Sequence, residues 1–449
     1  MKNDPDRQAL MDQVIERFRK ELDAQWTDDN ATLEQIEEAV DRIGKAVLPK
    51  LQEELTNKRA KKPRDNQADC SCGAKARFRN MQTRTLVTRH GLLPWTRPTY
   101  YCAACRQGCA PLDKTLALDK GNTTLPVRDW IAFLAAKMTF AEAKQVLMKT
   151  NRIDLSAATV ERVAVHAGTS LRAAQQKEAQ QHHEDCLPDR RTSCPSRLYV
   201  GADGLMAPLR DAWKKDASTG ALKCRYGECK SGVVYTTSTD KKGRDSRVRT
   251  HAYTASLEGV ESFEKLLATL AHRCGHHAAK QVIVLGDGAP WLWNMFGRSF
   301  PGAVQILDFY HACEHLAKVG DAMHGKDTEL SRHWQKLRQD ELKDNQVAAV
   351  VKTILAWQPT SEAHREIRRI ESGYFADNAE RMRYKSYIEK GYHIGSGVVE
   401  ATCKHVVAQR LDQAGMHWRP ATAEAIVALR AAQLSTVPTD LRPHLAMSA

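Results

Sequence analysis

The sequence predicts a mixed α/β fold joined to a helical and cysteine-containing N-terminal half. From residue 197 onward, strand-forming runs are followed by a helix and two further apolar strands, which describes a mixed sheet with helical crossovers. Before that point, residues 1 to about 60 repeat apolar side chains every three or four positions, and residues 70 to about 115 hold five cysteines. With 449 residues, the chain is long enough for two to four domains of about 150 residues each.

The composition favours a globular protein with a polyanionic partner. Hydrophobic residues make up 42% of the chain and charged residues 27%, so a substantial core can be buried. The net charge of +13 favours nucleic acid, with a membrane surface or no specific partner as alternatives. No apolar run approaches the roughly 18 residues of a membrane span, and the N-terminus lacks the apolar core of a signal peptide. We therefore expect a cytoplasmic protein with no membrane partner.

The first predicted region, residues 1–66, is helical. Apolar residues from Leu33 to Leu55 form one stripe, and Thr32 with Gln35 gives the capping-box pattern at its start. Pro49 should kink this helix, because proline lacks an amide donor. The stripe is short and interrupted, which favours a helical hairpin over a dimerising coiled coil.

A polar stretch from Lys58 to Asp69 reads as a linker to a second region, residues 67–125. There, two cysteine pairs lie about 30 residues apart and are joined by strand-forming sequence, a pattern that resembles a zinc ribbon: Cys70, Cys72, Cys102 and Cys105. Twelve cysteines in a reducing compartment favour metal ligation over disulfides, and four thiolates complete a tetrahedral zinc site. Cys109 is an alternative ligand, and a decayed site packed through its apolar neighbours is the alternative to zinc. A bound zinc would be structural and would present Arg77, Arg79 and Arg84 to DNA.

The third region, residues 126–196, is again helical. Two short helical patterns, Phe140–Thr150 and Ala157–Gly168, are separated by a polar break, and Ser156 can cap the second. This is the rhythm of a helix-turn-helix. An ordinary helical hairpin gives the same pattern and, on the pattern alone, is favoured.

Three carboxylates suggest the chemistry of the second half. The strands RLYVGADG and QVIVLGDG lead to Asp203 and Asp287, each followed by glycine. On neighbouring strands they would converge at one sheet edge and could hold two Mg²⁺ or Mn²⁺ ions about 3.5–4 Å apart. Glu400 lies one turn into a helix after a Gly-Ser-Gly loop and supplies a third carboxylate. The alternatives are ordinary Asp-Gly turns and a surface pair between Glu400 and Lys404.

Basic and aromatic residues around these carboxylates are candidates for DNA contacts. Lys404 and Arg410 follow Glu400 on the same helix, and His311 lies in the run DFYHACEH, where it could shape the site or contact DNA. A structural polar network is the alternative for that run, and its ligand set is too incomplete for zinc. Between them, residues 317–388 form a helical insertion whose side chains could stack on and clamp DNA, or form a packed helical face: Tyr374, Phe375, Asn378, Arg381 and Arg383.

The chain resembles the ISKra-type family of bacterial insertion-sequence transposases, which belong to the DDE group. The resemblance covers nearly the whole chain and is most specific in VGADGLMAPLRD, VIVLGDGAPWLWN, ILDFYHACEHL and GYHIGSGVVEATCKHVVAQRL. It implies a ribonuclease H-like catalytic core in two parts, residues 197–316 and 389–449, around the helical insertion. It also implies that Asp203, Asp287 and Glu400 form the catalytic and metal-binding triad. The family usually has two residues between the first two ribbon cysteines, whereas Ser71 alone separates them here.

The function implied by this resemblance is metal-dependent cleavage and joining of DNA strands without a covalent enzyme–DNA intermediate. The N-terminal half would bind the terminal inverted repeats of the element, and double-stranded target DNA would be the second partner. Joining two DNA ends implies a homodimer or a larger assembly. Two alternatives remain at this point: a DNA-binding repressor that has lost catalysis, and a structure-selective nuclease that cuts without joining.

Overall fold

The computed structural model describes residues 5–26, 30–58, 65–187, 194–210, 220 and 224–447. The chain divides into two compact units, the first of Met1–His166 with Leu441–Ala449 and the second of Ala167–Asp440. Residues 59–64 of the expected linker lie outside the described residues. The six functional regions expected from the sequence remain predictions, because a division into compact units assigns no roles.

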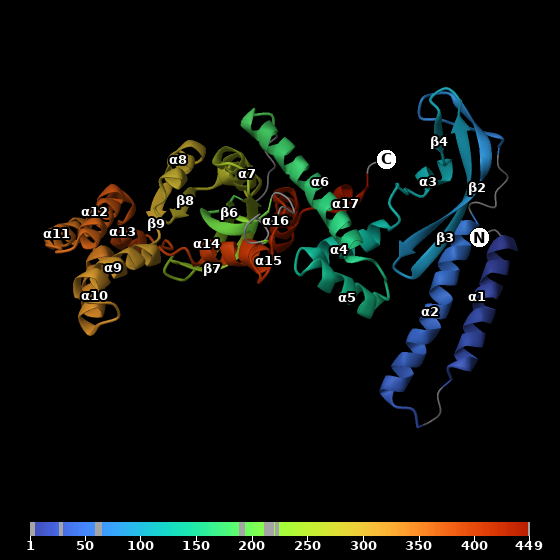
Figure 1. Ribbon diagram of the computed structural model, residues 1–449, viewed down its shortest axis with the longest axis horizontal. Coiled ribbons are helices and arrows are strands. Elements are labelled where there is room, and N and C mark those ends of the chain that lie inside the picture. Colours follow the sequence, from blue (N-terminus) through green and yellow to red (C-terminus); the bar gives the residue numbers. More distant parts are fainter. Residues whose placement is uncertain are drawn as a thin grey trace. The chain divides into compact units, whose positions relative to one another are not determined.

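The first unit opens with a helical hairpin, α1 (Pro5–Ala24) and α2 (Leu33–Asn57), whose two helices lie side by side (Figure 1). The predicted capping box is present: the Thr32 amide donates to Gln35 Oε1 at 2.8 Å, and the Gln35 amide donates to Thr32 Oγ1 at 3.3 Å. The helix continues through Pro49 without interruption. Only part of the apolar stripe is buried, and it centres on Ile43 and Val47.

A four-stranded antiparallel sheet follows in the order β1-β2-β3-β4. Its strands are β1 (Gln67–Asp69), β2 (Lys75–Thr88), β3 (Gly91–Cys102) and β4 (Gln107–Cys109). β2 and β3 make one long hairpin rather than the short strands expected, because they pair continuously except at one bulge. Trp95 is fully buried on this hairpin and donates its indole N–H to Asp113 at 2.7 Å, which ties the short helix α3 (Pro111–Thr115) to it.

Three helices follow: α4 (Leu125–Ala135), α5 (Phe140–Asn151) and α6 (Ala157–His183). The main segment of the first unit ends at His166, within α6, and the rest of α6 belongs to the second unit. α5 and α6 begin where the sequence predicts. A left-handed residue, Arg152, ends α5, and the Ser156 hydroxyl caps α6 by accepting from the Thr159 amide at 3.1 Å. α6 continues far beyond Gly168, because its apolar positions stay buried as far as Ala179. The helix-turn-helix interpretation remains a prediction. The C-terminal helix α17 (Arg442–Leu445) also belongs to this unit.

The second unit is built on a mixed five-stranded sheet in the order β7-β6-β5-β8-β9. β5 (Arg197–Leu209), β6 (Arg225–Thr239) and β7 (Asp245–Ser256) form an antiparallel meander, whereas β8 (Gln281–Gly286) and β9 (Val304–Leu307) run parallel to β5. The crossovers are α7 (Val260–Arg273), with the 3₁₀ turn η1 (His276–Ala278), and α8 (Pro290–Ser299). The predicted mixed α/β architecture is confirmed.

One expectation about the strands is wrong. Asp203 does not end its strand but lies in the middle of β5, since β5 continues to pair with β6 as far as Leu209 and Arg225. Asp287, by contrast, directly follows the last residue of β8.

Helices occupy most of the predicted insertion and gather beyond β9 (Figure 1). They are α9 (Phe309–His324), α10 (Glu329–Lys343), α11 (Val347–Ala356), α12 (Glu362–Asp377), η2 (Ala379–Arg381) and α13 (Tyr384–Glu389). The chain then returns to the sheet through α14 (Gly397–Thr402), a π-helical segment η3 (Cys403–Ala408), α15 (Gln409–Leu411) and α16 (Pro420–Leu434). Among the described residues no helix is both long and apolar enough to cross a membrane.

Candidate active site and candidate zinc centre

Asp203 and Asp287 lie at the same level on neighbouring strands. β5 and β8 pair in parallel up to Gly201 and Leu285, and two further steps along each chain reach the two aspartates. Burial raises the pKa of Asp203, and the nearby charge of Asp287 raises it further. The strand register and this electrostatic effect put the two residues near each other, and the expected convergence of their carboxylates at one site remains a prediction.

Asp203 is fixed in its local surroundings. Its Oδ1 accepts the amide hydrogen of Gly204 at 2.6 Å, and its Oδ2 accepts from the Cys403 thiol at 3.3 Å. These two hydrogen bonds and the charge of His311 oppose the rise in the pKa of Asp203. Cys403 belongs to the π-helical segment, a kind of distortion often found at functional sites.

The loop after Asp287 is held by the helical insertion. The Tyr374 hydroxyl of α12 donates to the Asp287 carbonyl at 2.9 Å. Gly288 has φ of +108°, and a Cβ there would come within 2.6 Å of the Tyr374 ring, so both the conformation and the space require glycine. Tyr374 in turn stacks on His315 at 3.7 Å between ring centroids, and His315 bonds the buried Glu371 at 2.5 Å.

A third aspartate completes this row. β8 and β9 pair in parallel as far as Gly286 and Leu307, so Asp308, the residue directly after β9, continues the level of Asp287. Asp308 is only 2% exposed and caps α9 by accepting the Tyr310 amide at 2.8 Å. The sequence drew attention to the surrounding run but not to this placement.

Glu400 is exposed on α14, which belongs to the segment that returns to the sheet after the helical insertion, and it comes near this row of aspartates. Its Oε1 lies 3.1 Å from the hydroxyl of Ser396, which also donates a hydrogen bond to Asp308. Thus α14 connects Glu400 to the strand edge through one buried serine.

The predicted triad is not drawn together to the spacing of a metal-ligand set. Within the described ranges, the group of metal-ligating side chains whose donor atoms all lie within 4.8 Å of one another consists of four cysteines. The roles of Asp203, Asp287 and Glu400 therefore remain a prediction that rests on their placement.

Of the basic residues around the triad, Lys404 is exposed on the face that follows Glu400. Arg410 is different: it is 1% exposed, with its guanidinium 4.6 Å from the Trp418 ring centroid, and so it faces the interior rather than a DNA surface. The His311 side chain is partly exposed and lies 3.3 Å from Glu314.

The insertion follows the packed-face alternative for most of its named residues. Phe375 and Asn378 are buried, and Tyr374 is used by the Asp287 loop. Arg381 lies 4.5 Å from the Trp293 ring centroid and donates to Gln305 at 2.8 Å, whereas Arg383 is exposed and pairs with Glu380.

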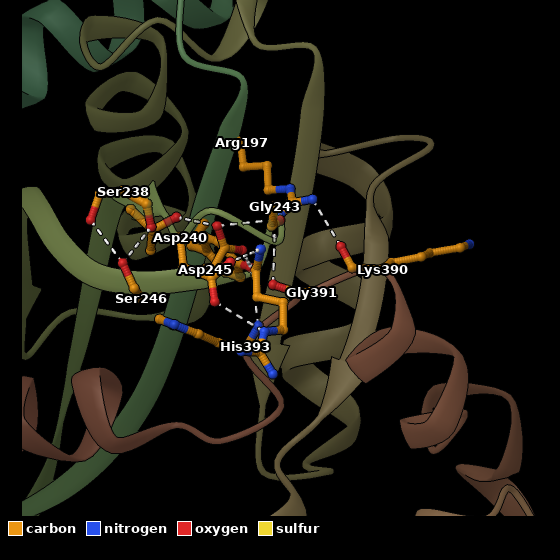
Figure 2. Close-up of polar contacts among 12 residues, drawn as sticks. Arg197, Ser238, Asp240, Gly243, Asp245, Ser246, Lys390, Gly391 and His393 are labelled. Carbon is orange, nitrogen blue, oxygen red and sulfur yellow. Dashed lines mark hydrogen bonds and ion pairs between the residues drawn. The ribbon is translucent and has the colours of Figure 1, made fainter.

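A second group of polar side chains lies near the start of β5 and is centred on the carboxylate of Asp245, whose oxygens both have hydrogen-bond partners (Figure 2). The side chain of Asp245 is fully buried and accepts from Tyr199, from Thr237 at 2.6 Å and from Arg197 at 3.1 Å. Arg197 also donates to the carbonyls of Gly243, Lys390 and Gly391, which fastens the return segment after the insertion to the sheet. Every oxygen of this carboxylate is satisfied, so the cluster is structural.

In the first unit, the four predicted cysteines converge. Cys70 and Cys72 lie in the turn after β1, Cys102 ends β3, and Cys105 lies in the turn before β4. Cys70 Sγ is 3.6 Å from Cys105 Sγ, and Cys72 Sγ is 3.6 Å from Cys102 Sγ. Tetrahedral zinc with Zn–S bonds near 2.3 Å requires sulfurs about 3.8 Å apart. The cluster can therefore hold a structural metal such as zinc.

The one-residue gap at Ser71 does not prevent this arrangement. The turn is closed by the Cys70 amide, which donates to the Ala74 carbonyl at 2.9 Å, and Gly73 takes φ of +87°. Hydrogen bonds from the Cys72 amide and the Cys105 thiol lower the pKa of Cys70 to about 6. The predicted substitute, Cys109, lies outside the four-sulfur group.

Two of the three arginines beside the cysteines face solvent. Arg77 and Arg79 are exposed on β2. Arg84 is largely enclosed, donates to Asn122 at 3.4 Å and to the carbonyl of Gly121, and lies 3.8 Å from Asp113. Of the three, Arg77 and Arg79 are the ones placed to meet a ligand.

A family model matches residues 24–442, nearly the whole chain. The chain belongs to the uncharacterised protein family UPF0236. No curated protein matches it. Among solved structures, it is similar to a chain of the Drosophila P element transposase strand transfer complex, with 11% identity and a TM-score of 0.23 over 71% of this chain and 81% of that one. A likeness of this size establishes no shared fold.

In this UPF0236 chain, the sequence located both candidate centres but missed the residues that support them. Ser396 connects Asp308 to Glu400, and Cys403 donates to Asp203. Tyr374 fixes the Asp287 loop. The sequence signal that could have indicated this contact was Asp287-Gly288, because a glycine often marks a position where another group comes close to the backbone. Nothing in the sequence indicated which side chain makes that approach.

Proposed function

We propose that Ala167–Asp440 contains a ribonuclease H-like core and that the protein is a DNA transposase of the ISKra type, a polynucleotidyl transferase encoded by a bacterial insertion sequence. The sheet order supports this: three antiparallel strands are followed by two strands parallel to the first, with helical crossovers. Fold alone never specifies chemistry, so the proposal rests on the site.

The observation that carries the proposal is the row of carboxylates. Asp203 and Asp287 occupy one level of the parallel pair β5 and β8, and the pKa of Asp203 is raised by burial and further by the negative charge of Asp287. A divalent cation relieves such repulsion, and carboxylate oxygens are the ligands that Mg²⁺ and Mn²⁺ prefer. Glu400, exposed and one helix away, is the third carboxylate.

In the proposed mechanism, the protein supplies position and electrostatics. Two bound Mg²⁺ or Mn²⁺ ions would activate a water or a DNA 3′-hydroxyl and stabilise the leaving oxygen. Asp203 and Asp287 would hold these ions on the rigid sheet, and Glu400 would close the set from α14. Tyr374 would keep the Asp287 carbonyl in place, and Lys404 would attract the phosphate backbone. Arg410 has no part in this, since it is buried.

The partners in this proposal are double-stranded element ends and target DNA. The net charge of +13 suits both, and Arg77 and Arg79 on the zinc-ribbon-like sheet are exposed for contact with terminal inverted repeats. The need to join two DNA ends implies a homodimer or larger complex. The DNA partner implies that this complex works in the cytoplasm, on the nucleoid.

The test is cleavage and joining of labelled duplexes that carry the ends of the element, in Mg²⁺ or Mn²⁺ and in EDTA. Asp203→Asn, Asp287→Asn and Glu400→Gln should each lower the rate at least about a thousandfold, since losing a metal ligand removes several kcal/mol of transition-state stabilisation. Glu366→Gln, which neutralises an exposed acid paired with Arg369 on α12, is the matched control and should retain activity.

Three outcomes would overturn parts of this proposal. Salt-sensitive end binding without cleavage in any metal would indicate a DNA-binding repressor. Metal-dependent cutting without joining would indicate a structure-selective nuclease. Activity that survives Glu400→Gln would remove Glu400 from the triad and leave the aspartate pair.

A further inference from the structure

The hydroxyl of Ser396 faces two carboxylates at once. Its oxygen lies 3.1 Å from Glu400 Oε1 and also bonds to Asp308. A serine hydroxyl carries one proton and can donate only one hydrogen bond. While both carboxylates are ionised, one of them receives that proton and the other faces only lone pairs.

Burial decides which carboxylate takes the proton. Asp308 is 2% exposed and Ser396 is 7% exposed, whereas Glu400 is exposed. A buried ionised group loses far more by going without a hydrogen bond than an exposed one, which water can solvate. The Tyr310 amide satisfies only Oδ1 of Asp308, so Oδ2 depends on Ser396.

We propose that Asp308 is a positioning residue that keeps Glu400 available to a divalent cation by taking the only proton of Ser396. Without a donor, Glu400 rests against the serine oxygen but is not held there, and it can turn towards a metal on Asp203 and Asp287. This inference rests on the proposed function, because it assumes that Glu400 closes a metal site.

The surrounding geometry holds the serine in this role. Ser396 lies at the start of α14, and its carbonyl accepts from the Val399 and Glu400 amides at 2.6 and 2.9 Å. The residue before it, Gly395, packs against Tyr310 so closely that a Cβ would lie 2.6 Å from the ring. The Phe309 amide donates to the Ile394 carbonyl at 2.9 Å, which joins the two segments directly. These contacts hold the serine beside Asp308, whereas the Glu400 side chain is exposed to solvent.

The proposal predicts that a second substitution restores the Mn²⁺ affinity lost through the first, which a general loss of structure would not produce. In Asp308→Asn, the new amide donates to the Ser396 oxygen, so the serine proton is released to Glu400 and holds it away from the metal. The Mn²⁺ concentration for half-saturation should rise about tenfold, the equivalent of one hydrogen bond to a charged group. Adding Ser396→Ala removes the donor that holds Glu400. The double variant should return to within about twofold of the wild type.

The experiment is a Mn²⁺ titration of the full, zinc-loaded chain, followed by the electron paramagnetic resonance of free Mn²⁺, with Asp203→Asn as the site-free control. If wild type and Asp203→Asn bind Mn²⁺ equally, the proposed metal site itself is wrong. If only the control loses binding but Asp308→Asn is unchanged, or the double variant binds more weakly than Asp308→Asn, the role of Asp308 is wrong and the metal site stands.

Ser396→Ala alone provides a second reading if Asp308→Asn does not fold. It leaves the buried Asp308 short of a donor, so thermal stability should fall, yet nothing then holds Glu400 and Mn²⁺ affinity should stay the same or increase. A tenfold weaker affinity in this variant would also overturn the inference.

Discussion

The cysteine cluster of the first unit and the carboxylate row of the second are both candidate metal centres, yet only one has the spacing of a ligand set. The four sulfurs lie within 4.8 Å of one another, whereas the carboxylates of the predicted triad do not form such a group among the described residues. Cys70, whose pKa is lowered to about 6, can stay in contact with Cys105 because the Cys105 thiol donates a hydrogen bond to its sulfur. Carboxylates that remain ionised repel one another and stay apart until a cation arrives.

This difference separates a structural centre from a catalytic one. A preformed four-sulfur set has no open position and suits a metal that holds strands together. A row of separated carboxylates, with the exposed Glu400 nearby and the Asp287 loop fixed by Tyr374, suits metals that must also accept substrate. The fully paired Asp245 is a useful third case, because it belongs to the same sheet as Asp203 and has no capacity left for a ligand.

The largest effect should follow removal of the thiolate metal. Structural zinc sites contribute on the order of 10 kcal/mol in small domains. The end of the sheet β1–β4 that carries the cysteines has only a small core around Ala76, Tyr100 and Cys102, and a separate core around Trp95 lies at the other end. Stripping zinc with a strong chelator, or Cys102→Ser, should unfold the cysteine end, as followed by hydrogen exchange of the β2 and β3 amides there. Cys109→Ser is the matched control and should change neither zinc content, expected at one per chain, nor exchange. A chain that holds no zinc and keeps its exchange protection would make the cluster a packed remnant.

The second effect is a difference in stability between substitutions at two aspartates of the five-stranded sheet. Asp245→Asn removes the fully buried charge that pairs with the partly buried Arg197 and should cost about 3 kcal/mol in the free energy of unfolding, since breaking such a pair leaves the other charge uncompensated. Asp203→Asn removes a carboxylate whose pKa burial has raised, so metal-free stability should hold or rise while metal binding is lost. Denaturant unfolding in EDTA measures both. Equal destabilisation by the two variants would mean that Asp203 is also a structural residue.

These contrasts show how far sequence patterns reach. Strand and helix starts followed from local rules: the Thr32 capping box and the Ser156 cap are where the sequence predicts them. The end of β5 did not, because its extension past Asp203 depends on pairing with β6, a partner that no local pattern encodes. The sequence likewise named Cys70 as a ligand, but whether its turn could close depended on the amide of that residue reaching Ala74.

Side-chain roles were harder to predict than side-chain types. Their residue types made Arg410 and Tyr374 candidates for DNA contacts, but in the structure both side chains make contacts inside the protein. An arginine or tyrosine has a long apolar body, so its position in a helix does not reveal whether its polar end meets solvent or a buried carbonyl. Asp308 gave the reverse problem, since only the strand register places it beside Asp287.

A third, smaller effect tests the support of the open site. Tyr374→Phe deletes the hydroxyl that fixes the Asp287 carbonyl, and Tyr387→Phe deletes a comparable hydroxyl that donates to the Gln305 carbonyl at 3.1 Å. Each should cost about 1 kcal/mol of stability, the usual value of one hydrogen bond. Only Tyr374→Phe should also weaken Mn²⁺ binding, by several fold, in the same titration. Equal Mn²⁺ affinities in the two variants would show that the insertion does not support the metal site.

The smallest effect is a pH dependence with opposite signs at two aspartates. Asp203 has a folded-state pKa raised by burial above the usual 3.8, so the folded chain binds its proton more tightly than the unfolded chain. Its contribution to stability is therefore complete below about pH 3.8 and is lost as the pH rises through the raised value. Asp240 is partly exposed, and the amide and side chain of Arg244 lower its pKa, so its contribution is present above pH 3.8 and is lost as the pH falls through the lowered value. Unfolding in EDTA across this range should show that Asp203→Asn removes a decline with rising pH, whereas Asp240→Asn removes a gain. The same proton competes with metal, so Mn²⁺ affinity should decrease as the pH falls through the raised pKa of Asp203. An affinity that is constant across that range would place the metal on other ligands.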